Sequence, residues 1–581
     1  MKPPREFAEA VNVSKGPHIV TVQGIDNIVL SLVERWRTKS ARPKVVAVDG
    51  FAGIDWERLR KELEESARRN SLSVKIYDFD SCRRADKSID SLIERYLDND
   101  KVFGKVFRRS IDSFFSKESI ISLRAHIMLD RESKQDDLII VIGWGCALRD
   151  MRNEYDCVVY FDLTREEALK RFKKAGATFG TQSIGPKRLY YVDFPVSEKH
   201  RNELLETLNL YVDANCEDSP IMLATEDLRR IVLEIASKPF RLKPIYEPGP
   251  WGGQWLKKVR HLPQDWSNCA WSYEVIAPEM SLLIKNYETM LELPWKLFFH
   301  LTHESVMGTS DRKLFGGEFP IRFDYLDTMD GGDLSIQVHP PTDYIRRNFN
   351  ERYHQGEMYY VVDCKPGKRV NLGLQEGASL DEFKKAAEMA EREGIPFDYT
   401  KFVNGVAVQK HDILMIPPGT VHGSGEGLVV LEISSTTYRY TFKIYDHLRP
   451  DLSGVMRPIH IHHAFRVIKQ HRRSAWVEKN LVPKPILKTC GKGWREFLIA
   501  SGKSFFHQVF RVEIETEASF ELEGRFHILT LVEGESVKLI SNGNEFVLNY
   551  SETVIVPAST GCYTMRAGGK GKCMVVKALL K

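Results

Sequence analysis

The chain has 581 residues, of which 43% are hydrophobic and 28% are charged, and its formal net charge is +4. This composition excludes wholesale disorder, and the length predicts about three or four domains. Because the net charge is small, we expect neither a nucleic-acid nor a membrane partner. The longest apolar stretch, Leu138–Leu148, is too short to cross a bilayer, the N-terminus lacks an apolar signal core, and the nine cysteines form no CxxC pair. We therefore expect a cytoplasmic protein with free thiols.

Apolar strand-like runs alternate with charged helix-like runs between residues 45 and 235. Strands are predicted at Val45–Asp49, Val74–Phe79, Leu138–Ile142 and Cys157–Asp162. Helices are predicted at Trp56–Asn70, Ser88–Leu97, Val106–Phe115 and Thr164–Lys174. Thr164 is the expected N-cap of the last helix, with Glu167 three residues further on. This alternation predicts a parallel α/β sheet.

A segment rich in proline and glycine, Ser237–Gly253, separates two different sequence patterns and predicts a domain boundary. Short strand-like runs follow it at Leu334–Val338, Met358–Asp363, Ile413–Ile416 and Leu428–Ile433. They indicate an all-β sandwich or barrel, interrupted by one helical insert at Ser379–Arg392. The predicted domains are an α/β domain at 1–238, an all-β domain at 239–470 with its insert at about 376–404, and a second β domain at 471–581.

The turn after the first predicted strand occupies the place of a phosphate-binding loop. Its sequence, VVAVDGFAGIDWERL, resembles the start of uridine-kinase-like P-loop kinases, with Gly50 and Gly53 in matching places, and the resemblance extends over about 40–235. The residues that carry the chemistry of such a loop are replaced here by Asp55, Trp56 and Glu57. Two carboxylates repel a polyphosphate, and the lysine contact is missing. We expect a degenerate kinase-like domain without nucleotide-binding residues, used for binding or assembly; an unrelated α/β domain remains an alternative.

Four polar residues in the all-β part predict a metal site. Gln337 and His339 are two residues apart on a predicted strand, so their side chains share a face. Glu357 begins the next strand, and His422 follows a Pro-Gly turn at the end of a third. If these strands are adjacent, two imidazoles, a carboxylate and an amide oxygen converge. That set suits zinc, with manganese, iron or cobalt as alternatives.

The segments that carry these residues are LSIQVHP (334–340), GEMYYVVD (356–363) and IPPGTVHGSG (416–425). In this order they resemble the type I mannose-6-phosphate isomerases, zinc-dependent cupins that interconvert mannose 6-phosphate and fructose 6-phosphate. The resemblance covers about 240–581 and implies a multidomain chain in which a P-loop-kinase-like α/β domain precedes cupin (jelly-roll) domains. It also implies that Arg439 is the active-site arginine and that the hydroxyl of Ser335 holds the substrate phosphate.

Two departures from that family affect the expected activity. Asp324 and Gln355 stand where the family usually has lysines of its catalytic and substrate-binding groups. Each lost charge-assisted phosphate contact weakens binding by about 1.5–3 kcal/mol. Arg322 is a candidate replacement cation and Asp324 a candidate base, although a surface arginine and a structural aspartate are alternatives. The predicted function is a metal-dependent aldose–ketose isomerase for a sugar or sugar phosphate. The alternative is a non-catalytic metal- and sugar-binding cupin, a sensor or scaffold fused to an inactive kinase-like domain.

Overall fold

The computed structural model describes residues 10–37, 44–97, 100–133, 135–175, 185–275, 278–435, 439–569 and 571–581. The chain divides into two compact units. The N-terminal unit contains Asn12–Glu234 and Ser281–Leu301, and the C-terminal unit contains Ile235–Met280 and Thr302–Lys581. A short piece of the isomerase-like half of the sequence therefore folds with the N-terminal unit. Within the described ranges, no helix has the length and apolar character that a membrane crossing requires.

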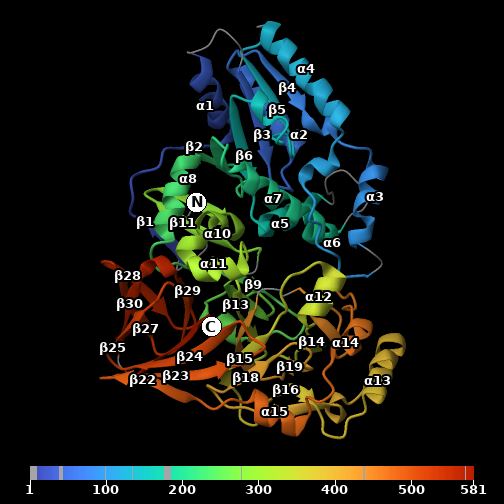
Figure 1. The fold of residues 1–581 in the computed structure, drawn as a ribbon, viewed down its shortest axis with the longest axis vertical. Coiled ribbons are helices and arrows are strands. Elements are labelled where there is room, and N and C mark those ends of the chain that lie inside the picture. The colour runs from blue at the N-terminus through green and yellow to red at the C-terminus, as the bar shows by residue number, and fades with distance from the viewer. Residues whose placement is uncertain are drawn as a thin grey trace. The chain divides into compact units, whose positions relative to one another are not determined.

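The N-terminal unit is built on a seven-stranded sheet (Figure 1). Its strands, in spatial order, are β2 (Thr21–Gln23), β8 (Ile221–Ala224), β7 (Leu210–Asp213), β6 (Cys157–Asp162), β3 (Lys44–Gly50), β5 (Leu138–Ile142) and β4 (Val74–Asp78). The five strands from β7 to β4 run parallel, whereas β8 and β2 pair antiparallel. The helices are α1 (Ile25–Arg37), α2 (Trp56–Arg69), α3 (Asp86–Leu97), α4 (Lys117–Ser133), α5 (Arg165–Ala175), α6 (Pro186–Arg188), α7 (Phe194–Leu204) and α8 (Thr225–Ile235). The predicted parallel α/β sheet is confirmed.

Local signals explain two of these helices. The Asp55 carboxylate accepts a hydrogen bond from the Arg58 N–H at 3.0 Å and so caps α2. Thr164 caps α5 as predicted, because its Oγ1 accepts a hydrogen bond from the Glu167 N–H at 3.1 Å.

The predicted helix at Val106–Phe115 is wrong. This segment is irregular chain that ends in a short 3-10 turn, Ile111–Phe114. The rings of Phe107 and Trp144 each lie 5.5 Å from the ring of Phe114, measured between centroids. Burial of these aromatic side chains in one cluster determines the path of the segment, and local helix propensity yields to it.

A small three-stranded sheet holds residues 281–301 in the N-terminal unit. It consists of β1 (Val11–Ser14), β11 (Ser281–Asn286) and β12 (Thr289–Pro294), and α10 (Trp295–Met307) follows. The Asn12 side-chain amide donates a hydrogen bond to the Leu283 carbonyl at 3.1 Å. The Glu292 N–H donates one to Asp213 Oδ2, at the end of β7, at 2.7 Å. The added sheet is thus tied to the main sheet by buried polar groups.

Two antiparallel sheets form the first part of the C-terminal unit. The six-stranded sheet has the order β18 (Ile413–Ile416), β15 (Glu357–Cys364), β20 (Leu428–Ser435), β13 (Ile321–Asp327), β10 (Trp271–Val275) and β9 (Ile245–Glu247). The five-stranded sheet has the order β17 (Val403–Ala407), β16 (Arg369–Leu374), β19 (His422–Ser424), β14 (Ile336–Val338) and β21 (Phe442–Tyr445). The helices of this part are α9 (Trp255–Val259), α11 (Thr309–Phe315), α12 (Thr342–Phe349), α13 (Leu380–Glu393), α14 (Ile461–Val467) and α15 (Ser474–Leu481). The predicted helical insert is α13, which Ser379 caps.

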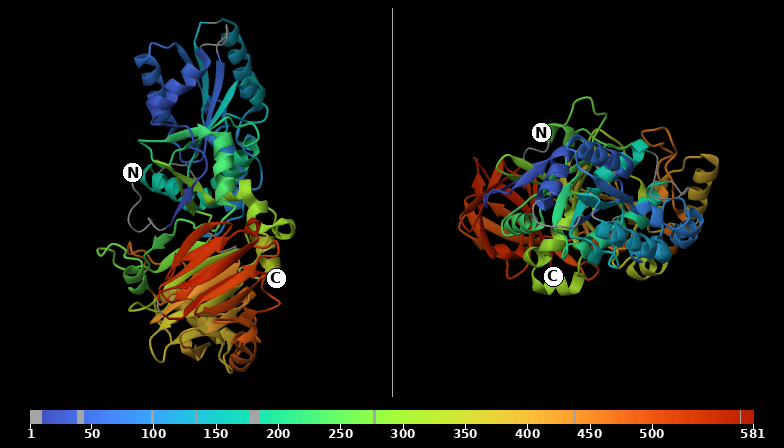
Figure 2. Two further views of the ribbon diagram at one scale, coloured as in Figure 1. Left: turned by 90° about the vertical axis from the view of Figure 1, so that its left-hand side faces the viewer. Right: turned by 90° about the horizontal axis from the view of Figure 1, so that it is seen from above.

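Two further sheets form the last part of the chain, coloured orange and red in Figure 2. The six-stranded one has the order β22 (Ile486–Gly491), β23 (Trp494–Ser501), β24 (His507–Ile514), β31 (Cys573–Leu580), β26 (His527–Glu533) and β29 (Thr553–Val556). The four-stranded one has the order β25 (Glu517–Glu521), β30 (Cys562–Gly568), β27 (Ser536–Ser541) and β28 (Asn544–Asn549). Apolar side chains of both sheets share one buried core, including Val512, Leu529, Val537 and Met565. The all-β character predicted for this half is confirmed.

Candidate metal centre

Two of the candidate ligands face each other across paired strands. Gln337 on β14 lies directly opposite His422 on β19. His339 follows the end of β14, two residues after Gln337, and so projects from the same face. Strand pairing in the five-stranded sheet therefore brings three predicted residues together.

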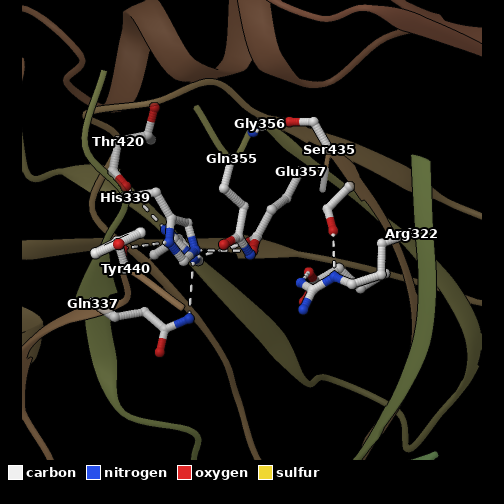
Figure 3. Close-up of polar contacts among 12 residues, drawn as sticks. Arg322, Gln337, His339, Gln355, Gly356, Glu357, Thr420, Ser435 and Tyr440 are labelled. Carbon is white, nitrogen blue, oxygen red and sulfur yellow. Dashed lines mark hydrogen bonds and ion pairs between the residues drawn. The ribbon is translucent and has the colours of Figure 1, made fainter. Parts of the chain in front are cut away.

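The fourth candidate ligand comes from the other sheet. Glu357 is the first residue of β15 in the six-stranded sheet, so its carboxylate meets the imidazoles across the space between two sheets. The sequence had suggested instead that it comes from an adjacent strand. Ligand atoms of His339, Glu357 and His422 all lie within 4.8 Å of one another. Figure 3 shows the side chains of His339 and Glu357 pointing toward each other. The three residues are 2%, 1% and 0% exposed.

The hydrogen bonds of both imidazoles leave the same nitrogen for a ligand. His339 Nδ1 lies 3.3 Å from the Tyr440 carbonyl, and His422 Nδ1 lies 2.9 Å from the Thr420 carbonyl. A carbonyl only accepts, so Nδ1 is the protonated nitrogen in each ring. Each Nε2 is then directed at Glu357, at 2.8 Å from Oε1 for His339 and 3.1 Å from Oε2 for His422. This is the arrangement that metal-ligating histidines have in proteins.

Buried atoms at the centre of the cluster fit a divalent cation. Within the described part of the chain, His339 Nε2 and Glu357 Oε2 are buried without a partner in hydrogen-bond geometry. Such atoms destabilise a fold unless something satisfies them. Burial alone would raise the pKa of Glu357, but the two neighbouring imidazoles hold it well below its usual range. An ionised carboxylate between two imidazole Nε2 atoms is a donor set that suits zinc.

Gln337 and Ser335 form a hydrogen-bonded pair beside the cluster. The Ser335 hydroxyl donates to Gln337 Oε1 at 3.0 Å, and Gln337 Nε2 lies 3.3 Å from His422 Nε2. Metal ligation requires the amide oxygen on the His422 side, and a half-turn of the amide exchanges the two atoms. Ser335 is buried and lies against the amide. Its predicted role as a phosphate ligand stays a prediction.

Arg322 is the centre of a buried charged group next to the metal candidates. It is buried, which excludes the surface alternative. Its guanidinium lies 2.6 Å from Glu432 Oε1 and 3.5 Å from Asp324 Oδ1, and it donates to the Ser434 hydroxyl at 3.1 Å. The replacement cation suggested by the sequence is therefore present, but it is already paired with the carboxyl groups of Asp324 and Glu432.

Asp324 and Glu432 face each other on paired strands β13 and β20. Asp324 Oδ1 is buried, and none of the described residues forms a hydrogen bond with it. Burial raises the pKa of Asp324 to about 6; the charge of Arg322 opposes this rise and that of Glu357 adds to it. Burial, then the charges of Asp324 and Glu357, raise the pKa of Glu432 well above its usual range. Sequence reasoning did not identify Glu432 as a site residue, although a lone carboxylate within the apolar run LVVLEI could have indicated it.

Lys443 is a second residue that sequence reasoning missed. It lies opposite Gln337 on the strand pair β14–β21. Its neighbour Phe442 contacts the rings of Tyr344 and Phe349 of α12, so Lys443 projects from the opposite face of the sheet, which is the face of Gln337. Burial lowers the pKa of Lys443 to about 8, and its ammonium lies 3.4 Å from Asp446.

The remaining two predicted residues have clear contacts. Gln355, at one of the two positions where the family usually has a lysine, donates from Nε2 to Glu357 Oε1 at 2.5 Å and so orients that carboxylate. Arg439 pairs with Glu279 at 2.6 Å. The residue after it, Tyr440, is the one whose carbonyl contacts His339. The backbone therefore places Arg439 next to the cluster, and its catalytic role stays a prediction.

Two kinds of known protein match this chain: a family model matches its N-terminal part, and mannose-6-phosphate isomerases match more than half of its length. Residues 24–237 match the model of a domain of unknown function, DUF8485, so the P-loop-kinase resemblance stays a prediction. "Probable mannose-6-phosphate isomerase GmuF" of Bacillus subtilis (strain 168) is 28% identical over 335 residues, which cover 56% of this chain and 96% of that protein. Mannose-6-phosphate isomerase ManA of the same organism is 24% identical over 352 residues, covering 59% and 99%. The crystal structure of mannose 6-phosphate isomerase from Bacillus subtilis aligns with a TM-score of 0.47 and 21% identity, over 59% of this chain and 99% of that one. Over more than half of its length, the chain is homologous to mannose-6-phosphate isomerases.

Proposed function

We propose that the C-terminal unit is a metal-dependent aldose–ketose isomerase that acts on a sugar phosphate, with mannose 6-phosphate as the first substrate to test. The convergence of His339, Glu357 and His422 within 4.8 Å carries this proposal. Homology to mannose-6-phosphate isomerases over 56–59% of the chain supports the reaction class.

The residues that would hold the ion are His339, Glu357 and His422, with Gln337 as the fourth ligand. Nε2 of both imidazoles and the Glu357 carboxylate already face one another. A bound divalent ion would polarise the carbonyl and hydroxyl oxygens of the open-chain sugar.

We assign proton transfer to Asp324. The reaction moves one proton between C2 and C1 of the sugar, while a hydroxyl proton passes from the C2 oxygen to the C1 oxygen, so the atoms balance. Asp324 has one oxygen without a hydrogen-bond partner, and Arg322 lies beside it at 3.5 Å. Its carboxylate would accept the proton from C2 and return it to C1. A carboxylate whose pKa burial has raised toward neutrality is a suitable general acid–base.

Lys443 and Arg439 are the cations that we assign to the substrate. The site lacks the two family lysines, and Arg322 is already paired with the carboxyl groups of Asp324 and Glu432. Lys443 projects toward the site from β21 and would contact an anionic oxygen of the substrate. Arg439 would stabilise negative charge that develops on the sugar oxygens.

The test is a coupled assay for conversion of mannose 6-phosphate to fructose 6-phosphate by zinc-loaded full-length protein. Turnover should disappear, together with bound zinc, in Glu357→Gln and His422→Ala. The matched control is Asp363→Asn, which removes a half-buried carboxylate from the same strand, β15, where Asp363 accepts a hydrogen bond from the Cys364 N–H at 2.9 Å. Zinc-loaded protein without turnover would overturn the isomerase. Sugar binding measured on that same protein would then favour the sensor or scaffold alternative.

A further inference from the structure

A cavity of about 480 Å³ lies in the N-terminal unit at the carboxyl ends of the parallel strands. Its walls are the loop at residues 52–56 after β3, Trp144 after β5, and Ala168, Arg171 and Phe172 of α5 after β6. Its volume is within the usual range of small-molecule sites, roughly 300–1,000 Å³. Nothing in the proposed isomerase reaction uses this cavity.

The sheet topology marks the same place. From β3 the chain crosses to β4, on the far side of β5, whereas from β6 it continues to β7 on the other side. The connections after the adjacent strands β3 and β6 therefore leave in opposite directions. In open α/β sheets, ligands bind at such a switch point, at the carboxyl ends of the strands.

Aromatic side chains give the cavity a surface that suits a ring. Trp56, Trp144 and Phe172 all line it, and Trp56 and Phe172 remain half-buried. Rings of this kind stack on flat heterocycles and on the C–H faces of sugars.

A buried carboxylate in the wall needs a donor. Asp193 lines the cavity and is 1% exposed. Its Oδ1 accepts a hydrogen bond from Arg188 Nε at 3.2 Å, whereas Oδ2 is buried and has no hydrogen-bond partner among the residues that the structure describes. A hydroxyl or N–H of a bound molecule would satisfy that oxygen.

Three carboxyl groups, of Asp55, Asp193 and Glu217, and two cations, Arg171 and Lys174, line the cavity, and the place of the carboxyl groups disfavours phosphate. The Asp55 carboxylate caps the start of α2, where a phosphate-binding loop would present its N–H groups. Glu217, paired with Arg58 at 3.0 Å, also lines the cavity. Arg171 is held by Glu167 at 3.0 Å. Carboxylates thus stand where a polyphosphate would place its own negative charge.

We propose that this cavity binds an uncharged, hydroxylated ring compound without phosphate groups, with its ring against Trp56 and Phe172 and a hydroxyl or N–H donated to Asp193 Oδ2. Nucleosides and free hexoses share this chemistry.

The experiment is isothermal titration calorimetry of the full chain with adenosine, cytidine, mannose and ATP. We expect one of the first three to bind and ATP to bind more weakly than adenosine. Trp56→Ala and Phe172→Leu should each weaken binding about tenfold, the effect of losing one stacking contact. Tyr287→Ala is the matched control, because Tyr287 is an aromatic residue of the same unit that is 57% exposed and does not line the cavity.

The different ligands distinguish a nucleoside from a free sugar, and the cavity variants distinguish binding in this cavity from binding in the C-terminal unit. A nucleoside signal identifies a heterocycle, and a mannose signal that Trp56→Ala weakens identifies a free sugar in this cavity. Circular dichroism checks that each variant is folded. Absence of binding by adenosine, cytidine and mannose at millimolar concentration would overturn the proposal. ATP binding that equals or exceeds adenosine binding, or binding that both folded cavity variants leave unchanged, would do the same.

Discussion

Asp324 has a different environment from the other carboxylates of the candidate site. Glu357 lies between two imidazoles and Glu432 is held by Arg322 at 2.6 Å, whereas Asp324 has no imidazole beside it among the described residues and lies 3.5 Å from Arg322. Asp324→Asn keeps the size of the side chain and removes its basicity. We expect kcat for mannose 6-phosphate to fall at least about 100-fold, since loss of a general acid–base typically has that effect. A coupled assay with metal analysis of the same samples checks this.

The metal content separates catalysis from structure in that variant. Asp324 is not a candidate ligand, so Asp324→Asn should retain zinc that Glu357→Gln loses. Asp363→Asn, on β15, should retain both zinc and turnover. An Asp324→Asn variant with parental kcat would exclude Asp324 as the proton carrier.

Ser335 offers a test between two roles. Its hydroxyl donates to Gln337 Oε1, so the structure places it behind a candidate ligand, whereas the family resemblance predicts contact with the substrate phosphate. If the hydroxyl holds the amide, Ser335→Ala should weaken zinc binding about 10- to 100-fold, the usual effect of losing such a partner. Competition with a chelator measures this affinity. A raised KM at unchanged zinc affinity would instead support the phosphate role.

The sequence identified residues within compact motifs and missed residues that only long-range pairing places. Gln337, His339, Glu357 and His422 stand in short motifs whose spacing is readable. Lys443 lies opposite Gln337 because its strand pairs with β14, across more than 100 residues of sequence. Strand register is decided by the packed sheet, so no local pattern could have placed it.

At the scale of single elements, helix caps make a quantitative test. Thr164 accepts the hydrogen bond that starts α5 and is buried. Thr164→Ala should lower the free energy of unfolding of the N-terminal unit by about 1 kcal/mol, and Thr164→Ser should restore most of it. Urea unfolding measures both. An equal loss in Thr164→Ser would assign the effect to the lost methyl group and not to the cap.

The glycines of the turn after β3 show why an element can resemble a phosphate loop without serving as one. A Cβ on Gly50 would lie 2.5 Å from the Phe161 carbonyl on the neighbouring strand β6. Gly53 has a φ of +106°, and a Cβ there would lie 3.3 Å from that of Ala168. Close packing of the turn on β6 and α5 therefore explains both glycines, and no bound phosphate is needed to account for them.

Predicted strands were accurate where apolar runs were bounded by turn residues, as in β5, β6 and β18. The same reasoning failed at 106–115, which was predicted as a helix, because Phe107 and Phe114 pack into an aromatic cluster with Trp144. The parallel order of the sheet was predictable from the alternation of strands and helices. The composition did not indicate that residues 281–301 fold with the N-terminal unit and not with the cupin part.

For the whole molecule, Asp213 makes the attachment of residues 281–301 to the N-terminal unit dependent on pH. Burial raises the pKa of Asp213 to about 7, against hydrogen bonds from the Glu292 N–H and from Asn215 that lower it. An unfolded aspartate titrates near 4, so the folded state binds this proton more tightly. The contribution of Asp213 to stability is therefore fully present below about pH 4 and is lost as the pH rises to about 7. The fall in thermal unfolding temperature between pH 5 and 8 should be smaller in Asp213→Asn than in the parent. An identical fall in both would assign the pH dependence to other groups.

Division of the chain at the predicted boundary should damage the isomerase half. A fragment 239–581 retains β11 and β12 but lacks β1 and the parallel sheet, their partners in the N-terminal unit. Four side chains of β11 and β12 are fully buried in the whole chain: Leu282, Ile284, Leu291 and Leu293. Exposure of an aliphatic side chain costs about 1.5–3 kcal/mol, so the four together cost on the order of 6–12 kcal/mol, comparable with the stability of a whole domain.

We expect the 239–581 fragment to aggregate or to be cleaved within 281–301 by a trace of protease, whereas the full chain resists cleavage there. The control is the same fragment with 281–301 replaced by a glycine–serine linker, which removes the exposed apolar surface and should remain monomeric in size-exclusion chromatography. If the unmodified fragment is monomeric and as resistant as the full chain, the C-terminal unit can bury this segment by itself. If it is not, the segment makes the N-terminal unit a requirement for a stable isomerase half, which gives a physical reason for the two parts to share one chain.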